Sequence, residues 1–187
     1  GGDGAVGKID AVQEVAAVEV DGEALPPFPE VGGYVAPVDA DPAVGATPPT
    51  LRGQDFEGEP VSIDMDDGRA KVVAFLAHWC SHCQAEVPLI QGWIDDGNLP
   101  DDVDVYGVST DARSDQNNYP PSKWLDREGW TGEILLDHAD GTAANAWGRT
   151  GYPYIVFVNS DGTVARRGSG EVPIDQFAAL VDEISGS

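Results

Sequence analysis

The 187-residue chain has few cysteines, few basic residues and no long apolar run. Its two cysteines are too few for a scaffold of several disulfides. Lysine and arginine total only 10, so the chain lacks the basic patches that nucleic acids and anionic membranes require. No stretch of about 18 apolar residues is present, and we therefore expect no membrane-spanning helix in this sequence. A hydrophobic content of 41% at this length instead indicates one globular core.

Acidic residues, by contrast, are abundant. The chain carries 33 aspartates and glutamates, and its formal net charge is −23. Lysine occurs only at Lys8, Lys71 and Lys123. A chain with this charge repels itself at low ionic strength, whereas molar salt shortens the screening length to about 3 Å. The Asp-rich, Lys-poor composition resembles that of proteins from extreme halophiles, so we expect a halophilic source and no nucleic-acid partner.

Residues 1–46 differ in composition from the rest of the chain. They are dense in proline, glycine and aspartate after residue 20, which predicts an N-terminal extension or linker that can be partly ordered. Residues 11–20 are compatible with either a short helix or a strand. The start has no charged region followed by an apolar one, so no signal peptide is expected as given. Residues 47–187 form the predicted domain.

Strand and helix signals alternate from residue 50 onward. The expected elements are a hairpin around Glu57-Gly58, strands at 71–79, 102–110 and 133–137, helices at 81–96, 120–129 and 173–185, a helical turn at 141–148, and a hairpin around Asp161-Gly162. We expect Val87, Leu89, Ile90, Trp93 and Ile94 on the buried side of the helix at 81–96, and a kink at Pro88. This order predicts an α/β protein with a mixed sheet and helices on both faces.

The two cysteines lie three positions apart, in Trp79-Cys80-Ser81-His82-Cys83, where a buried strand gives way to a helix. Free backbone N–H groups and the positive end of the helix dipole stabilise a thiolate at such a junction, and His82 adds positive charge. We therefore predict that Cys80 is an exposed nucleophile and that Cys83 is a buried resolving thiol. A disulfide between such near neighbours closes too small a loop to stabilise a fold much.

These residues, together with "DVYGVST" and "WGRTGYPYIVFVNSDGTVARRGSG", resemble the thioredoxin superfamily, and more closely its TlpA/ResA/DsbE-like extracytoplasmic thiol-disulfide oxidoreductases. The resemblance covers roughly residues 47–185. It implies a thioredoxin-like fold, with a central mixed sheet flanked by helices and an added N-terminal hairpin. It also implies an enzyme that exchanges disulfides with protein thiols or disulfides and with an upstream redox partner. The implied location is extracytoplasmic, either tethered to a membrane or secreted, and we expect a monomer.

Further site residues follow from this resemblance. In the family, the proline that matches Pro153 is cis and faces the cysteine pair, and the backbone before it, here Tyr152, pairs with the substrate. Glu86 matches a buried glutamate that passes protons to or from the resolving cysteine. Ala74 replaces the buried aspartate of thioredoxins proper, and Tyr152 departs from the usual Thr or β-branched residue. The predicted catalytic residues are Cys80, Cys83 and Glu86; the predicted substrate-binding residues are Trp79, His82, Tyr152 and Pro153. No cofactor is expected beyond the redox-active Cys80–Cys83 disulfide.

Other interpretations are weaker. His78, Cys80, His82 and Cys83 are zinc or copper ligands by type, but four residues so close together at a strand–helix corner cannot easily all reach one ion. A metal-binding or chaperone module on the same fold is therefore the alternative hypothesis, with no metal expected. The Pro-x-x-x-Thr-x-x-Cys pattern of one-cysteine peroxidases is absent. Trp124, Trp130 and Trp147 are expected in the core, and His138, Asp95-Asp96 and Asp101-Asp102 at the surface.

Overall fold

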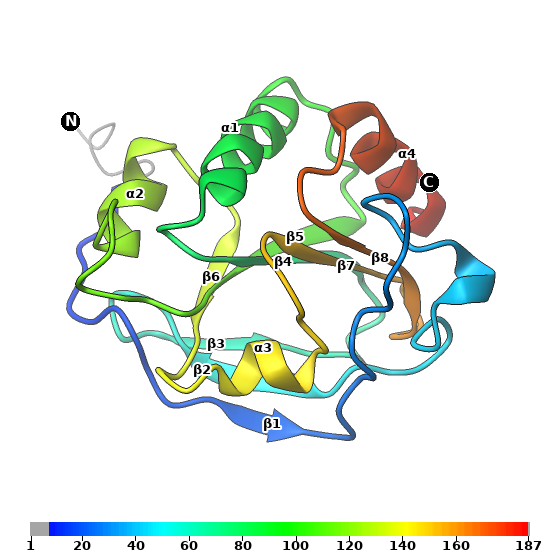
Figure 1. Ribbon diagram of the computed structural model, residues 1–187, viewed down its shortest axis with the longest axis horizontal. Helices are drawn as coiled ribbons and strands as arrows, with labels where there is room; N and C mark the ends of the chain where they lie inside the picture. Colours follow the sequence, from blue (N-terminus) through cyan, green and yellow to red (C-terminus); the bar gives the residue numbers. More distant parts are fainter. Residues whose placement is uncertain (1–7, 187) are drawn as a thin grey trace.

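The computed structural model describes residues 8–186 as two β-sheets with helices around the larger one (Figure 1). Residues 1–7 of the predicted extension lie outside the described residues. The strands are β1 (Glu19–Asp21), β2 (Thr50–Gln54), β3 (Pro60–Ile63), β4 (Ala70–Leu76), β5 (Val103–Ser109), β6 (Glu133–Leu136), β7 (Tyr154–Val158) and β8 (Val164–Ser169). The helices are the 3-10 turn η2 (Val38–Ala40), α1 (Ser81–Asp95), α2 (Pro121–Arg127), α3 (Thr142–Ala146) and α4 (Ile174–Ile184). None of these helices is long and apolar enough to cross a membrane.

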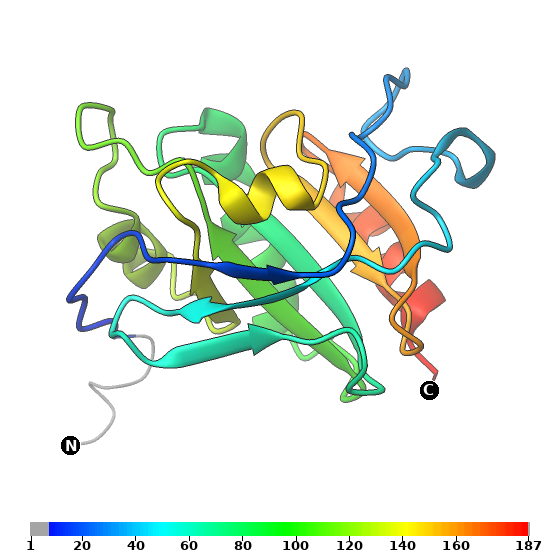
Figure 2. The same ribbon diagram turned by 90° about the horizontal axis from the view of Figure 1, so that it is seen from below.

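The central sheet has the strand order β6-β5-β4-β7-β8. Strands β4, β5 and β6 run parallel, and β7 runs antiparallel to both β4 and β8. Helices α1, α2 and α4 lie over one face, while α3 and the smaller sheet lie over the other (Figures 1 and 2). The structure thus confirms the predicted mixed α/β sheet with helices on both faces, and the two predicted hairpins.

Strand β4 is buried along its whole length, which explains its continuous apolar sequence. Its alternate side chains enter two separate cores. Val72 and Leu76 pack under α1 and α4 in one core. Val73 and Phe75 pack against the smaller sheet and α3 in the other. The chain leaving this central strand is therefore held firmly, and it leads directly into the cysteine motif.

The smaller sheet contains the predicted N-terminal hairpin, β2–β3, in which Leu51 pairs with Ile63. Strand β1 adds a third strand beside β2, with Val20 opposite Leu51. Of residues 11–20, for which the sequence favoured neither helix nor strand, only Glu19 and Val20 belong to this strand. Leu51, Val61 and Ile63 are buried against the central sheet, so the hairpin is part of the domain core.

Residues 8–46 have little regular structure but pack closely against the rest of the protein. The buried residues in this segment include Leu25, Phe28, Ala36 and Ala43. Asp41 forms an ion pair with Arg167 of β8 at 2.6 Å, and both side chains have 0% exposure. Arg167 also donates to the carbonyl of Pro26 at 2.7 Å. These contacts fasten the segment to an edge strand. The division of the chain at residues 46 and 47 stays a prediction.

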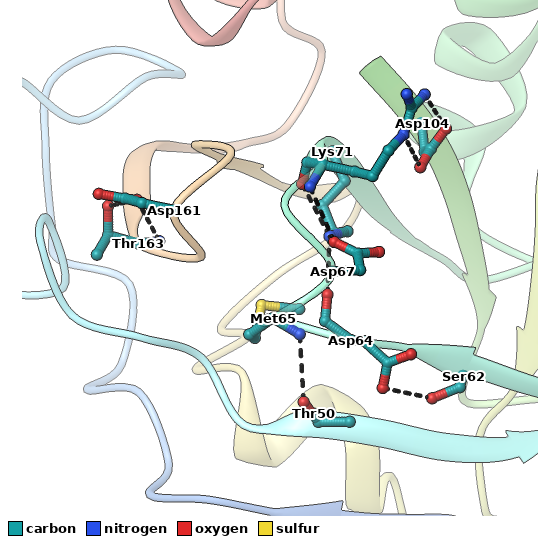
Figure 3. A network of polar contacts seen from close by, with 10 residues as sticks. Thr50, Ser62, Asp64, Met65, Asp67, Lys71, Asp104, Asp161 and Thr163 are labelled. Carbon is teal, nitrogen blue, oxygen red and sulfur yellow. Dashed lines mark hydrogen bonds and ion pairs between the residues drawn. The ribbon is translucent and has the colours of Figure 1, made fainter. Parts of the chain in front are cut away.

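A second buried cation, Lys71, lies at the beginning of β4, whereas the cysteine motif follows the other end of the strand. Figure 3 shows Lys71 beside Asp67. Its Nζ donates to the Asp67 carboxylate and to the Asp64 carbonyl, each at 2.7 Å. The neighbouring Arg69 pairs with Asp104 of β5 at 2.8 Å. These bonds satisfy the charge of a lysine with 0% side-chain exposure inside an apolar strand.

The predicted helices are present, with one correction in α1. Leu89, expected on the buried side, is 48% exposed. The buried side of α1 follows Cys83, Val87 and Ile90, and at 100° per residue Leu89 falls outside it. Trp93 and Ile94 are partly buried against the same core, and Pro88 lies inside the helix. The expected core tryptophans Trp124, Trp130 and Trp147 are all buried.

Candidate active site

Cys80 is the N-cap residue of α1, one short turn after β4 ends. Its own N–H donates to the carbonyl of Ala77, at 3.1 Å, which closes this turn. Cys83 follows in the first turn of the helix, and both cysteines are free thiols. The strand–helix junction predicted from the sequence therefore places Cys80 at the end of α1 where backbone N–H groups are unpaired.

The two cysteines differ in burial, although less than predicted. Cys80 keeps 9% exposure, and Cys83 has none. The expectation of an exposed Cys80 is thus corrected: the residue is nearly buried. The reason is the chain before β7: the Cys80 thiol faces the carbonyl of Tyr152, with sulfur and oxygen 3.8 Å apart. Only Cys80 can meet a reagent from solvent.

The environment lowers the pKa of the Cys80 thiol to about 6. The largest cause is a hydrogen bond from the Cys83 thiol, followed after an opposing burial effect by the backbone N–H groups of Cys83 and His82 and the charge of His82. The pKa of Cys83 is raised well above its ordinary value, mainly by burial and by the neighbouring Cys80. At neutral pH, Cys80 is therefore the thiolate and Cys83 the thiol.

Glu86 lies one turn beyond Cys83 on the buried side of α1, with 1% exposure. Its carboxylate accepts a hydrogen bond from the N–H of Val172 at 2.9 Å. Burial raises the pKa of Glu86 to about 7, partly offset by this hydrogen bond. The negative charge of Glu86 also contributes to the raised pKa of Cys83. A carboxyl group that titrates near neutrality thus lies electrostatically coupled to the buried thiol.

The other side of the site is built around the Tyr152-Pro153 peptide bond, which is cis as predicted. Pro153 is buried immediately before β7. The ring of Tyr152 meets the ring of Trp79 edge to face, with centroids 5.7 Å apart. Trp79 also donates its indole N–H to the carbonyl of Asp111 at 2.9 Å. These contacts place the aromatic pair beside Cys80.

Three charged residues around this aromatic pair were not anticipated from the sequence. The guanidinium of Arg113 lies 4.7 Å from the ring centre of Trp79, and that of Arg149 lies 5.2 Å from the ring centre of Tyr152. Asp111 pairs with Arg113 at 2.9 Å. A second cis proline bond, Tyr119-Pro120, was also missed. These residues lie far from the cysteines along the chain, and no local pattern marks them.

The two histidines near the cysteines have different partners. Both ring nitrogens of His78 are engaged, Nδ1 with the carbonyl of Asn117 and Nε2 with the N–H of Arg113, each at 2.9 Å. His78 is therefore a buried structural residue in this geometry. His82 instead contacts Glu171. Among residues 8–186, no group of three or more His, Cys, Asp or Glu side chains is arranged to hold a metal ion.

A cysteine pair at the start of a helix, facing a cis proline on a mixed sheet, defines a thioredoxin-like oxidoreductase. The chain belongs to the AhpC/TSA family, whose model matches residues 44–167.

Comparison with curated proteins gives two relatives that are both named thiol:disulfide interchange proteins. The thiol:disulfide interchange protein HelX of Rhodobacter capsulatus is 26% identical over 162 residues, which cover 81% of this chain and 86% of HelX. A thiol:disulfide interchange protein TxlA homolog of Synechocystis is 27% identical over 125 residues, or 67% of this chain. The chain spans about half of that relative, 54%.

Among solved structures, StoA from Bacillus subtilis superposes with a TM-score of 0.59 at 24% identity. The match covers 74% of this chain and 98% of StoA. At this identity the likeness supports the fold alone, and it confirms the thioredoxin-like architecture.

Proposed function

We propose that this protein exchanges disulfides with partner proteins through Cys80 and Cys83. The observation that carries this proposal is the contrast within the pair. Cys80, at the start of α1, has a thiol pKa lowered to about 6, while Cys83 has 0% exposure and a raised pKa. One thiol is thus a nucleophile at neutral pH, and the other is protected until the first has reacted.

The exchange proceeds in two displacements. The Cys80 thiolate attacks one sulfur of a partner disulfide, forms a mixed disulfide and releases a partner thiolate. Cys83 then loses its proton and attacks the Cys80 sulfur, which forms the Cys80–Cys83 disulfide and releases the second partner thiolate. The partner thiolates take up two protons, so the partner gains two electrons and two protons. The same steps in reverse oxidise a dithiol.

The remaining site residues support these steps. Glu86, with a pKa of about 7, accepts the proton that Cys83 loses and returns it in the reverse direction. The backbone at Tyr152 and Pro153 lies beside the Cys80 sulfur, where it can pair with an extended segment of the partner. Trp79 forms the wall next to Tyr152.

The partners and the setting form part of the proposal. We infer that the substrates are protein thiols or disulfides and that an upstream protein resets the pair, because the two curated relatives are named as interchange proteins. An extracytoplasmic location and a halophilic source rest on the sequence resemblance and on the net charge of −23. Fractionation of source cells, with thiol labelling by a membrane-impermeant maleimide, tests the location.

Labelling and trapping test the function together. In the reduced protein at pH 7, iodoacetamide should modify Cys80 before Cys83, because only Cys80 has both thiolate character and an opening to solvent. Cys80→Ser should abolish reduction of insulin disulfides, whereas Cys83→Ser should accumulate mixed disulfides with the substrate. Equal labelling of both cysteines, or turnover by Cys80→Ser, would refute the assignment. Metal retained stoichiometrically after dialysis, without disulfide exchange, would instead support the metal-binding alternative.

A further inference from the structure

The loop between β8 and α4 brings a carboxylate to the histidine inside the cysteine motif. Glu171 Oε2 lies 2.5 Å from His82 Nδ1, although the two residues are 89 positions apart. Both side chains are accessible, with exposures of 62% for His82 and 43% for Glu171. When Glu171 is ionised its oxygen can only accept, so the contact is a hydrogen bond in the state in which Nδ1 carries the proton.

The loop that carries Glu171 is fastened on both sides of it. The N–H of Gly170 donates to the carbonyl of Pro153, and the N–H of Val172 donates to the carboxylate of Glu86, each at 2.9 Å. Gly170 has a φ of +91°, and a Cβ there would lie 2.8 Å from the ring of Tyr34. The active-site proline, the buried glutamate and the N-terminal segment therefore all fix the position from which Glu171 reaches His82.

This contact acts on the protonation of His82. The hydrogen bond and charge of Glu171 raise the pKa of His82, and the negative charge of Cys80 acts in the same direction. The positive charge of His82 in turn helps to lower the pKa of Cys80. The negative charge of Glu171 also contributes to the raised pKa of the buried Glu86. Two anionic groups, the Glu171 carboxylate and the reactive thiolate, thus both favour the protonated form of His82.

We propose that Glu171 is a positioning residue that keeps His82 protonated and in place beside Cys80, and so stabilises the reduced state of the cysteine pair. This inference rests on the proposed disulfide exchange. A cation beside the thiolate stabilises the reduced form and makes the disulfide a stronger oxidant. The negative charge of Glu171 itself opposes the thiolate, so the sign of the change on removing it decides whether the effect through His82 dominates.

The test compares Glu171→Gln with Asp175→Asn, which removes the same charge from an exposed position in the first turn of α4. NMR titration of the His82 imidazole in the reduced protein should show a lower pKa in Glu171→Gln and no change in Asp175→Asn. In a glutathione equilibrium at pH 7 and constant salt, the constant for reduction of the protein disulfide should fall about two- to fivefold in Glu171→Gln. That corresponds to a potential lower by about 10–20 mV.

A second variant, His82→Gln, distinguishes an effect of Glu171 through His82 from a general loss of structure. In His82→Gln, the further change Glu171→Gln should no longer lower the constant for reduction of the protein disulfide, because the imidazole is gone and only the direct repulsion between Glu171 and the thiolate is removed. An unchanged His82 pKa, a raised potential, or an equal effect of Asp175→Asn would each overturn the proposal. If the cysteines failed to equilibrate with glutathione at all, the proposed function would be refuted. The His82 titration would then still decide whether Glu171 holds the imidazole charged.

Discussion

The buried carboxylate of Glu86 accepts the backbone N–H of Val172 at 2.9 Å and so joins the active-site helix to the loop before α4. Glu86 has 1% exposure, and one hydrogen bond does not replace the water that a carboxylate loses on burial. The result is a pKa of about 7, between the pKa values expected for a solvated carboxyl and for a resting thiol. The folded protein therefore contains an acid that changes its charge under the conditions in which Cys83 must react.

This raised pKa predicts a pH-dependent stability. The folded state holds a proton on Glu86 up to pH 7, whereas an unfolded glutamate releases it near pH 4.5. Between these values the folded state binds more protons, so the free energy of unfolding falls as pH rises, by up to about 3 kcal/mol. Glu86→Gln stays neutral and should lose this dependence. The lowered pKa of Cys80 acts in the opposite direction in the reduced protein, so the difference between wild type and Glu86→Gln in urea unfolding at pH 5, 7 and 8 measures the Glu86 contribution.

The comparison with wild type gives a clear sign. As the pH rises from 5 to 8, Glu86→Gln should become increasingly more stable than wild type. Its amide can still accept the N–H of Val172, and it never carries a charge. Glu183→Gln on the exposed side of α4 is the matched control and should show no such gain. Parallel stability curves for Glu86→Gln and wild type would contradict a raised pKa at this position.

The ion pair between Asp41 and Arg167 predicts a large effect far from the cysteines. Both side chains have 0% exposure, so Asp41→Asn leaves the Arg167 charge buried without its counter-ion. We expect a loss of about 3–5 kcal/mol in the free energy of unfolding. Glu19→Gln, which breaks the exposed pair with Arg52 at 2.6 Å, should cost far less, because solvent screens both charges. Denaturant titrations of the two variants measure the difference, and equal losses would show that residues 8–46 are not held by this pair.

The sequence predicted the parts of the structure that local patterns encode. The apolar run of β4 requires burial on both faces, and the change to helical spacing after it places Cys80 at the start of a helix. Motif spacing was also enough to locate the buried Glu86 and the cis bond before Pro153, through the resemblance to a known family. Each of these features depends on residues close together in the chain.

What the sequence did not predict depends on contacts between distant residues. Glu171 meets His82 across 89 positions, and Arg167 meets Asp41 across 126. In an acidic chain, the sequence alone predicts that a charged residue lies at the surface. Only the structure shows that it has a buried partner. Leu89 shows the same limit, because the orientation of α1 on the sheet decides which of its apolar residues is covered.

The net charge of −23 predicts that stability depends on salt. Below about 0.5 M salt, repulsion among surface carboxylates is less screened, so the melting temperature should fall. The buried Asp41–Arg167 pair is shielded from solvent and should contribute little to this dependence. Thermal melts from low salt to multimolar KCl measure the effect. A melting temperature that stayed constant over this range would argue against halophilic adaptation, and it would leave the proposed function intact.

The redox potential of the cysteine pair should lie above that of thioredoxin. His82 carries its charge beside Cys80, whose thiol pKa is lowered to about 6, and this stabilises the reduced form. The many carboxylates of the chain oppose the thiolate, but they are more distant and screened by salt.

We expect the neighbouring cation to dominate over the distant carboxylates, with a potential nearer to about −200 mV than to thioredoxin's value of about −270 mV. Equilibration with glutathione or dithiothreitol at high salt measures it. His82→Pro should lower the potential, because the substitution removes the cation at a position in the first turn of α1 where a helix tolerates proline. Ser81→Ala, next to it and exposed, is the matched control and should leave the potential nearly unchanged. A wild-type potential at or below thioredoxin's, or no response to His82→Pro, would show that the histidine does not set the direction in which this pair drives exchange.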